Sequence, residues 1–302
     1  METDIALILS SMLRLAAPLL FIALGELVAE KAGTLNVSVE GATLAGAFGA
    51  AAGSSAFGSA PIGLTIGVGV GVGVALVQAS FSHRLTVNQF VVGLTLNIFA
   101  LGLTSFFFAS TTLKPERFDI WSIPVLYKIP IIGEALFSQR APFFALYLLV
   151  FGVWLLLHRT RWGLEVQAAG ENPHAVDVVG INVNRLRRQA IIFGGALSGL
   201  GGAYLSIGVI GGFSPNMTAG RGFIAIAAVI FGGWTIRGTI IGCLIFGFMD
   251  ALRLSLPALG YELNPQLLIA SPYLAALFAM LLFSRRQRQP RFLGLGFTRR
   301  AI

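Results

Sequence analysis

The sequence predicts an all-α protein that crosses a membrane about eight to ten times, and three observations support this fold class. Hydrophobic residues make up 56% of the 302 residues, charged residues only 11%, and the mean hydropathy is +0.82. Soluble domains carry roughly 25% charged residues, so most of this surface cannot face water. Apolar stretches recur along the chain, and most approach the roughly 20 residues that a spanning helix needs. We therefore treat residues 1–302 as a single transmembrane domain.

Nine stretches are candidates for crossings. They are 5–24, 33–52, 61–79, 87–109, 142–157, 189–207, 223–233, 239–256 and 267–283. Stretch 33–52 has polar residues near its start, and stretch 223–233 is only about half a span, so broken or half helices are expected there. Residues 25–32 separate the first two stretches, and we interpret them as a charged break.

Glycines recur at four-residue spacing in two of these stretches. Gly63, Gly67 and Gly71 lie in one, and Gly195 and Gly199 lie in another. Residues four apart share one face of a helix, and small residues there let the backbone of a neighbouring helix approach closely. Both stretches are therefore predicted to pack tightly against other helices.

Two polar segments indicate the orientation of the chain. Residues 159–188 form a polar island with arginines at both ends, and the tail 285–302 holds six arginines and no acid. Arginines beside apolar spans mark the cytoplasmic side, so both segments are expected there, with four crossings between them. The second polar region, 111–140, and the N-terminus are then expected outside.

The chemistry that the sequence lacks excludes several classes of protein. The net charge of +8 comes from arginines clustered beside apolar spans, with only three lysines, which favours membrane orientation over nucleic-acid binding. No phosphate-binding G-x-x-x-x-G-K-[ST] loop and no G-x-S-x-G motif is present. The three histidines lie far apart, and Cys243 is the single cysteine, so no metal or cofactor site is expected. An enzyme is therefore disfavoured.

Two short motifs echo each other at the starts of apolar runs. Residues 36–41 read Asn-Val-Ser-Val-Glu-Gly, and residues 216–222 read Asn-Met-Thr-Ala-Gly-Arg-Gly. In the predicted topology the first run leaves the cytoplasm and the second approaches it. The pair is compatible with an inverted repeat whose polar starts lie near a substrate route, and equally with chance, since small polar residues are common here.

Three stretches, 25–50, 161–206 and 218–253, resemble the permease family of ATP-binding cassette importers for branched-chain amino acids, simple sugars and nucleosides. The run Glu-Lys-Ala-Gly-Thr-Leu-Asn followed by Val-Glu-Gly is most similar to the nucleoside branch. The resemblance implies a multi-pass protein of a bacterial plasma membrane. It also implies a second permease subunit, identical or different, an ATPase partner that binds the ATP, and an extracytoplasmic substrate-binding protein or lipoprotein.

The same resemblance gives the polar island a role. A short helix at about 173–179 would sit in a cleft of the ATPase, with Asn172 or Glu171 as its cap and Pro173 at its first position. The residues expected to couple to the ATPase are Glu171, Asn172, Pro173, His174, Ala175, Asp177 and Gly180. The alternative interpretation is an ordinary solvated loop.

Polar and aromatic residues at the broken stretches are candidates for the substrate pathway. They are Asn36, Ser38, Glu40, Phe90, Asn97, Asn216, Thr218 and Phe223. A nucleoside needs hydrogen-bonding groups for its ribose and base and an aromatic face for stacking. The polar members are equally compatible with contacts that hold helices together, and each Phe with lipid or core packing. Asp250 and Arg253, one turn apart, are expected to form a structural pair.

Three functions are compatible with these features. The first is a permease subunit for a small polar solute, with a nucleoside favoured and a simple sugar or an amino acid as alternatives. The second is an ion-coupled transporter, which usually carries several acids at the membrane midplane, whereas only Glu40 and Asp250 are candidates here. The third is a membrane scaffold without transport. The cytoplasmic island without a phosphate loop favours the first.

Overall fold

The structure is a computed structural model, and it describes residues 2–124, 126–128, 132–258 and 288–298, with positions 264, 266, 270, 271 and 274. The predicted crossing 267–283 lies outside this described part except for positions 270, 271 and 274. The arginines at 285, 286, 299 and 300 also lie outside it. The described elements are α1 (Glu2–Lys31), α2 (Val39–Phe57), α3 (Ala60–His83), α4 (Gln89–Ser110), β1 (Ile120–Ser122), η1 (Leu126–Lys128), α5 (Ile132–Phe137), β2 (Ser138–Arg140), α6 (Ala141–Arg159), α7 (Arg161–Glu171), α8 (Pro173–Val178), α9 (Val183–Ala203), the π-helical η2 (Tyr204–Ile210), α10 (Arg221–Phe231) and α11 (Ile236–Ala258).

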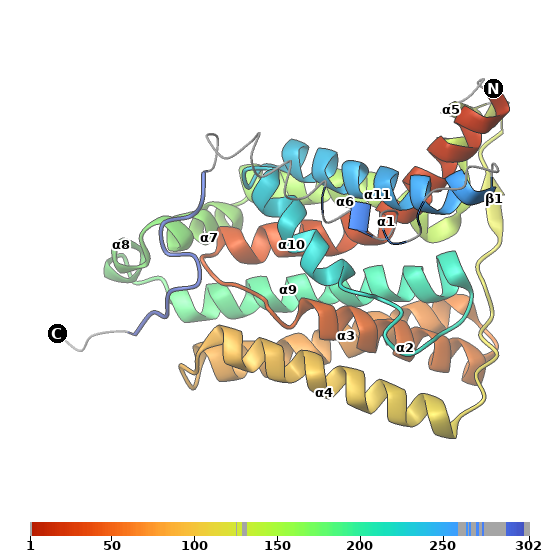
Figure 1. Cartoon of the computed structure of the whole chain (residues 1–302). Helices are drawn as coiled ribbons and strands as arrows, with labels where there is room; N and C mark the ends of the chain where they lie inside the picture. Colours follow the sequence, from red (N-terminus) through yellow and green to blue (C-terminus); the bar gives the residue numbers. More distant parts are fainter. Residues whose placement is uncertain are drawn as a thin grey trace.

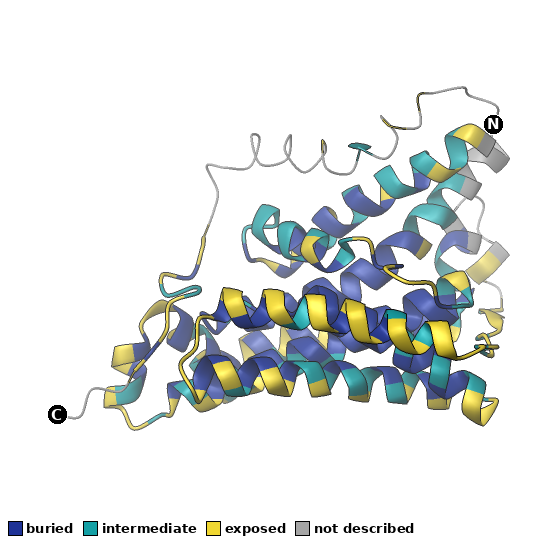
Figure 2. Ribbon diagram, turned by 60° about the horizontal axis from the view of Figure 1, so that its bottom comes forward, coloured by how far each residue is buried: buried dark blue, intermediate teal, exposed yellow. Residues whose placement is uncertain are grey.

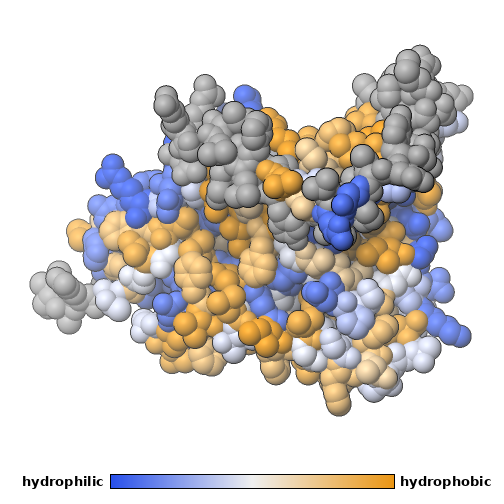
Figure 3. Space-filling model, in the orientation of Figure 1, coloured by the Kyte–Doolittle hydropathy of each residue, from blue (hydrophilic) through white to orange (hydrophobic). Residues whose placement is uncertain are grey.

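The predicted fold class is confirmed. In the described part of the chain, six helices are long and apolar enough to cross a membrane: α1, α3, α4, α6, α9 with η2, and α11. They lie roughly side by side, with α7 and α8 at one end of the molecule and β1 and α5 at the other (Figure 1). Hydrophilic residues gather at these two ends and hydrophobic residues spread between them (Figure 3). This is the surface expected of a protein whose middle faces lipid.

The close helix approaches expected from glycine spacing are present. A Cβ added at Gly71 of α3 would lie 2.6 Å from the Cα of Gly199 in α9, and closer still to the carbonyl oxygen of Gly195. Helix α9 also packs against α1 and α2. Exposed residues run along the outward faces of α3 and α4 (Figure 2), and the apolar residues Ile98 and Phe106 of α4 are exposed. Helices α1 and α9 therefore form the centre, and α3 and α4 lie toward the lipid.

Three predicted boundaries are corrected by the structure. Residues 25–31 are not a charged break, because α1 continues through Lys31. Helix α2 begins at Val39, not at residue 33. Most of the island 159–188 is helical, since it comprises α7, α8 and the first turns of α9. Several of the polar groups involved have protein partners, such as Glu26 with Asn36 and Glu30 with Trp234, so local polarity was a poor guide to helix ends here.

An extended segment closes the end of the molecule that carries β1. Strand β1 pairs antiparallel with β2, with Trp121 opposite Gln139. Between α4 and β1 the chain runs past α2, where Ser54 Oγ donates to the carbonyl oxygen of Glu116 at 2.9 Å. Arg117 Nη2 donates to the carbonyl oxygen of Ile210 at 2.5 Å. This segment thus ties the end of α2 to the end of η2. The sequence did not predict this hairpin.

Candidate functional site

The chain is broken before α2, and buried polar side chains hold the break. Residues 33–38 are not helical, and they run from the α8 end of the molecule to its middle, where α2 starts (Figure 1). Asn36 and Ser38 are fully buried. Asn36 Nδ2 donates to Glu26 Oε1 at 2.7 Å, and Asn36 Oδ1 accepts from Ser38 Oγ at 2.8 Å. The break is therefore anchored to α1.

Asn97 of α4 brackets the same break from the other side. Its Nδ2 donates to the carbonyl oxygen of Val37 at 2.8 Å, and its Oδ1 accepts from the backbone N–H of Gly41 at 2.7 Å. The first N–H groups of a helix have no partner within the helix, so the side chain satisfies one of them. Asn97 thus fixes where α2 begins.

A second break precedes α10. Residues 211–220 return from the β1 end to the middle, and α10 then runs toward the α8 end, opposite in direction to α2 (Figure 1). Asn216 and Gly220 both have positive φ, 58° and 82°. Asn and Gly are the residues that most readily adopt this left-handed conformation, so the sequence favours a turn here. This opposed arrangement is the one that an inverted repeat predicts.

Glu40 joins the two breaks. Its Oε1 accepts from Thr218 Oγ1 at 2.6 Å and from the backbone N–H of Gly220 at 2.9 Å. Its Oε2 accepts from the backbone N–H of Gly222 at 2.7 Å. Glu40 lies in the first turn of α2, while Gly220 and Gly222 start α10. The partial positive charges of two helix N-termini therefore meet around one carboxylate, which stabilises both.

A charged cluster follows on α10 and α11. Arg221 Nη2 lies 3.1 Å from Asp250 Oδ2, and Arg253 Nη2 lies 3.4 Å from Asp250 Oδ1. The predicted pair of Asp250 and Arg253 is confirmed, and Arg221 joins it. Because Asp250 of α11 pairs with Arg221 at the start of α10 as well as with Arg253 of its own helix, the cluster fixes α10 against α11.

Helix α8 projects from one end of the bundle. The side chain of Asn172 accepts from the backbone N–H of Ala175 at 3.1 Å, so Asn172 is the predicted cap, and Pro173 is at the predicted first position. The helix ends at Val178, one residue earlier than expected. Val178 and Val179 are 83% and 71% exposed. Val178, the last residue of α8, and Val179 directly after it form a small exposed apolar surface outside the bundle.

The sequence of this chain matches a known protein family. The family profile described as "Branched-chain amino acid transport system / permease component" matches residues 8–295. The chain belongs to this permease family. Permeases of this family are non-catalytic transport subunits of ATP-binding cassette importers, and they work with an ATPase and a substrate-binding protein.

Relatives with different named substrates resemble this permease. A nucleoside permease of Lactococcus lactis is 31% identical over 308 residues, covering 97% of both chains. A guanosine permease of Bacillus subtilis is 31% identical over 310 residues, covering 98% of this chain and 97% of its own. A protein of Haloferax volcanii, provisionally named a glucose permease, is 35% identical over 263 residues, covering 85% of this chain and 80% of its own.

The predicted pathway residues of the permease fall into two groups. Asn36, Ser38, Glu40 and Thr218 are buried and Asn97 is partly buried, and their side chains bond within the two breaks. Asn216, Phe223 and Phe90 are exposed. Asn216 and Phe223 flank the second break. Phe90 lies in the first turn of α4, and its backbone N–H donates to Asn88 rather than to either break. The first group positions the breaks, and the second offers free surface.

The predicted coupling residues lie together at the α8 end. Glu171 Oε2 is 3.9 Å from Arg291 Nε of the tail. His174 lies between the rings of Phe292 and Phe297, with centroids 5.9 and 5.2 Å away. Ala175 and Asp177 lie on α8, and Gly180 follows it with a φ of 85°.

Sequence reasoning missed several buried polar residues. Glu26 and Glu30 of α1 are fully buried, and Glu30 Oε2 accepts from Trp234 Nε1 at 2.5 Å. Their four-residue spacing puts both on one face of a helix, and this signal was hidden by reading residues 25–32 as a break. Arg187 was expected on a cytoplasmic surface, but it is fully buried. Its spacing of four residues from Val183 and from Ile191 puts it on the buried face of α9, a signal that could have distinguished it from Arg185 and Arg188.

Proposed function

We propose that this permease forms one half of the membrane pathway of an importer for nucleosides. The observation that carries the proposal is the meeting of the oppositely directed starts of α2 and α10 at Glu40, with Asn216 and Phe223 exposed at the same break. Non-helical backbone at membrane depth is tolerated only where it is buried in protein or lines a water-filled route for a solute, because lipid cannot satisfy its polar groups. The pathway lies against the second break and is completed by a second permease subunit.

The relatives and the exposed side chains favour nucleosides over sugars. Two relatives named for nucleoside or guanosine transport match this chain over almost its whole length. Phe223 is 42% exposed and follows Gly222, which donates to Glu40. An aromatic face stacks a base, and the amide of Asn216 both donates and accepts hydrogen bonds. A sugar is the second candidate, supported by the relative provisionally named for glucose.

Competition for uptake separates these candidates. In cells that express the permease with its ATPase and binding protein, unlabelled nucleosides should abolish uptake of a radiolabelled nucleoside, and excess glucose, ribose or leucine should not. Phe223→Leu should raise the half-saturating concentration about tenfold, because base stacking contributes ~1–3 kcal/mol. Phe106→Leu, at an exposed site on α4, is the matched control. Uptake of radiolabelled glucose that excess nucleosides do not inhibit would establish the sugar alternative.

Helix α8 is the proposed docking element for the ATPase. The arginine-rich tail supports an orientation with the α8 end in the cytoplasm and the β1 end outside. ATP binding by the paired ATPases then displaces α8, and the helices rearrange to open the pathway toward the docked binding protein; hydrolysis returns them. Val178 and Val179 supply the apolar contact, with Glu171, His174, Ala175, Asp177 and Gly180 around it.

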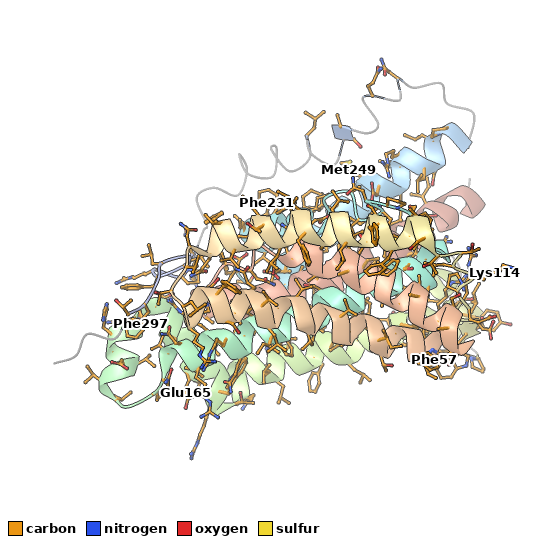
Figure 4. All side chains as sticks on the ribbon, turned by 90° about the horizontal axis from the view of Figure 1, so that it is seen from below. Phe57, Lys114, Glu165, Phe231, Met249 and Phe297 are labelled. Atoms are coloured by element: carbon orange, nitrogen blue, oxygen red, sulfur yellow. The ribbon has the colours of Figure 1, made fainter. Side chains whose placement is uncertain are left out.

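Charged substitutions on this apolar surface test the docking role. Val178→Asp with Val179→Asp should reduce recovery of the ATPase with the purified permease at least tenfold, because two carboxylates must then be desolvated at the contact. The matched control is Phe57→Asp, an exposed apolar residue at the opposite end of the helices from Phe297 and Glu165 (Figure 4). Full recovery of the ATPase with the double variant would place the docking site elsewhere.

A further inference from the structure

The described tail lies across two elements that are far apart in sequence. Phe292 N–H donates to the carbonyl oxygen of Gly170 at the end of α7, at 2.9 Å. Gly294 N–H donates to the carbonyl oxygen of Gly33, which follows α1, at 3.1 Å. We call residues 290–298 the tail clasp, because its backbone binds α7 on one side and the chain between α1 and α2 on the other.

Arg187 of α9 fixes the clasp from inside the protein. Its guanidinium is 0% exposed. Nε donates to the carbonyl oxygen of Ala32 at 3.1 Å, Nη1 to that of Leu295 at 2.7 Å, and Nη2 to that of Phe292 at 3.5 Å. A buried cation is stable only when its donors are satisfied, and here the acceptors come from both the α1–α2 connection and the clasp. The position of one is therefore tied to that of the other.

The clasp also grips α8. The ring of Phe297 is buried, its centroid lies 5.2 Å from that of His174, and the two planes meet at 64°. The ring of Phe292 lies on the same histidine at 5.9 Å. Asn184 at the start of α9 donates to the carbonyl oxygen of Phe297 at 3.4 Å. A movement of α8 therefore displaces the clasp through His174.

The connection between α1 and α2 leads directly to the first break. Gly33 has a φ of 79°, and a Cβ there would lie 2.8 Å from Arg187 Nη2 and 3.2 Å from the carbonyl oxygen of Phe292. Thr34 Oγ1 bonds to His83 Nε2 at 2.8 Å and donates to Gln89 Oε1 at 3.0 Å. Asn36, Ser38 and Glu40 follow within seven residues. Contacts are thus continuous from α8, through the clasp, to Glu40, where the starts of α2 and α10 meet.

From this continuity we propose that the tail clasp transmits movement of α8 to the break before α2, with Phe297 and Arg187 as its positioning residues. The inference rests on the docking role of α8 proposed above. Direct packing of α8 on α9 is a separate connection, so loss of the clasp leaves docking intact and weakens only the link between ATP hydrolysis and transport. The tail would then take part in transport itself, in addition to its arginines setting the orientation of the chain in the membrane.

A ratio of two rates tests the clasp. Permease, ATPase and binding protein are reconstituted in liposomes, and nucleoside uptake and ATP hydrolysis are measured together with recovery of the ATPase. Phe297→Ala should leave recovery unchanged and hydrolysis within about twofold, while uptake falls about tenfold, because truncation of the ring removes its contact with His174. Leu295→Ala, an exposed side chain on the same clasp, is the matched control and should match the unsubstituted complex.

Phe297→Leu tests the role of the clasp if the alanine variant fails to accumulate. Leucine keeps the apolar volume and loses the ring, so the ratio of uptake to hydrolysis should fall by a smaller factor, about threefold. An equal fall in uptake and hydrolysis, loss of ATPase recovery, or an unchanged ratio in both Phe297 variants overturns the clasp. Failure of the unsubstituted complex to take up nucleosides with ATP refutes the proposed function instead, so the two failures are distinguishable.

Discussion

Replacing Glu40 with alanine should destabilise the permease by about 3 kcal/mol or more and reduce uptake at least tenfold. The substitution leaves Thr218 Oγ1 and the backbone N–H groups of Gly220 and Gly222 without their acceptor. Buried donors that lose a charged partner cost about 1–3 kcal/mol each, and the two helix N-termini also lose the charge between them. The measurements are thermal unfolding of the detergent-solubilised protein and nucleoside uptake by the whole importer.

Two graded variants separate the bridge from a general loss of folding. Thr218→Val removes a single donor and should produce a small fraction of the effect. Glu40→Gln keeps one acceptor oxygen but directs an NH2 group at a backbone donor, so it should fall between the two. If Glu40→Ala unfolds at the same temperature as the unsubstituted protein and transports normally, the bridge between α2 and α10 has no role.

A leucine at Gly71 should prevent stable assembly of the helices, whereas a leucine at Gly73 on the same helix should be tolerated. A Cβ at Gly71 would lie 2.6 Å from the Cα of Gly199 and 2.8 Å from its backbone nitrogen. Backbone cannot move aside as a side chain can, so α3 must separate from α9, at ~3 kcal/mol or more. A Cβ at Gly73 meets nothing within 4 Å.

The amount of monodisperse protein extracted from membranes, and its unfolding temperature, measure this difference. Because the two variants have the same composition and differ only in the face of α3 that carries the leucine, hydrophobicity and expression level are matched. Equal recovery of both would show that the close packing of α3 on α9 does not stabilise the fold.

Features set by local spacing were predictable from the sequence. The glycine faces of α3 and α9, the short apolar helix α10 and the Asn172 cap all depend on residues within a few positions of one another. The opposed starts of α2 and α10 agree with one of the two interpretations that the short motifs left open, whereas the bridge itself was not predicted, because Glu40 and its partners are 178–182 residues apart.

Features set by distant contacts were not predictable. The acids Glu26 and Glu30 suggested a break in α1, yet Asn36 and Trp234 satisfy one oxygen of each inside the protein. Helical spacing puts Arg187 on the buried face of α9 with Val183 and Ile191, but its acceptors, the carbonyl oxygens of Ala32 and Leu295, are distant in sequence. A single sequence carries no signal for such pairings, because each partner is an ordinary backbone carbonyl.

The acceptors of Arg187 set an order for biosynthesis. Leu295 and Phe292 leave the ribosome 108 and 105 residues after the arginine they satisfy. Until then the guanidinium must keep water or another temporary partner. The part of the permease around Arg187 therefore matures only after residue 295 has been made, and a nascent chain halted before residue 292 carries an unfinished, hydrated version of it.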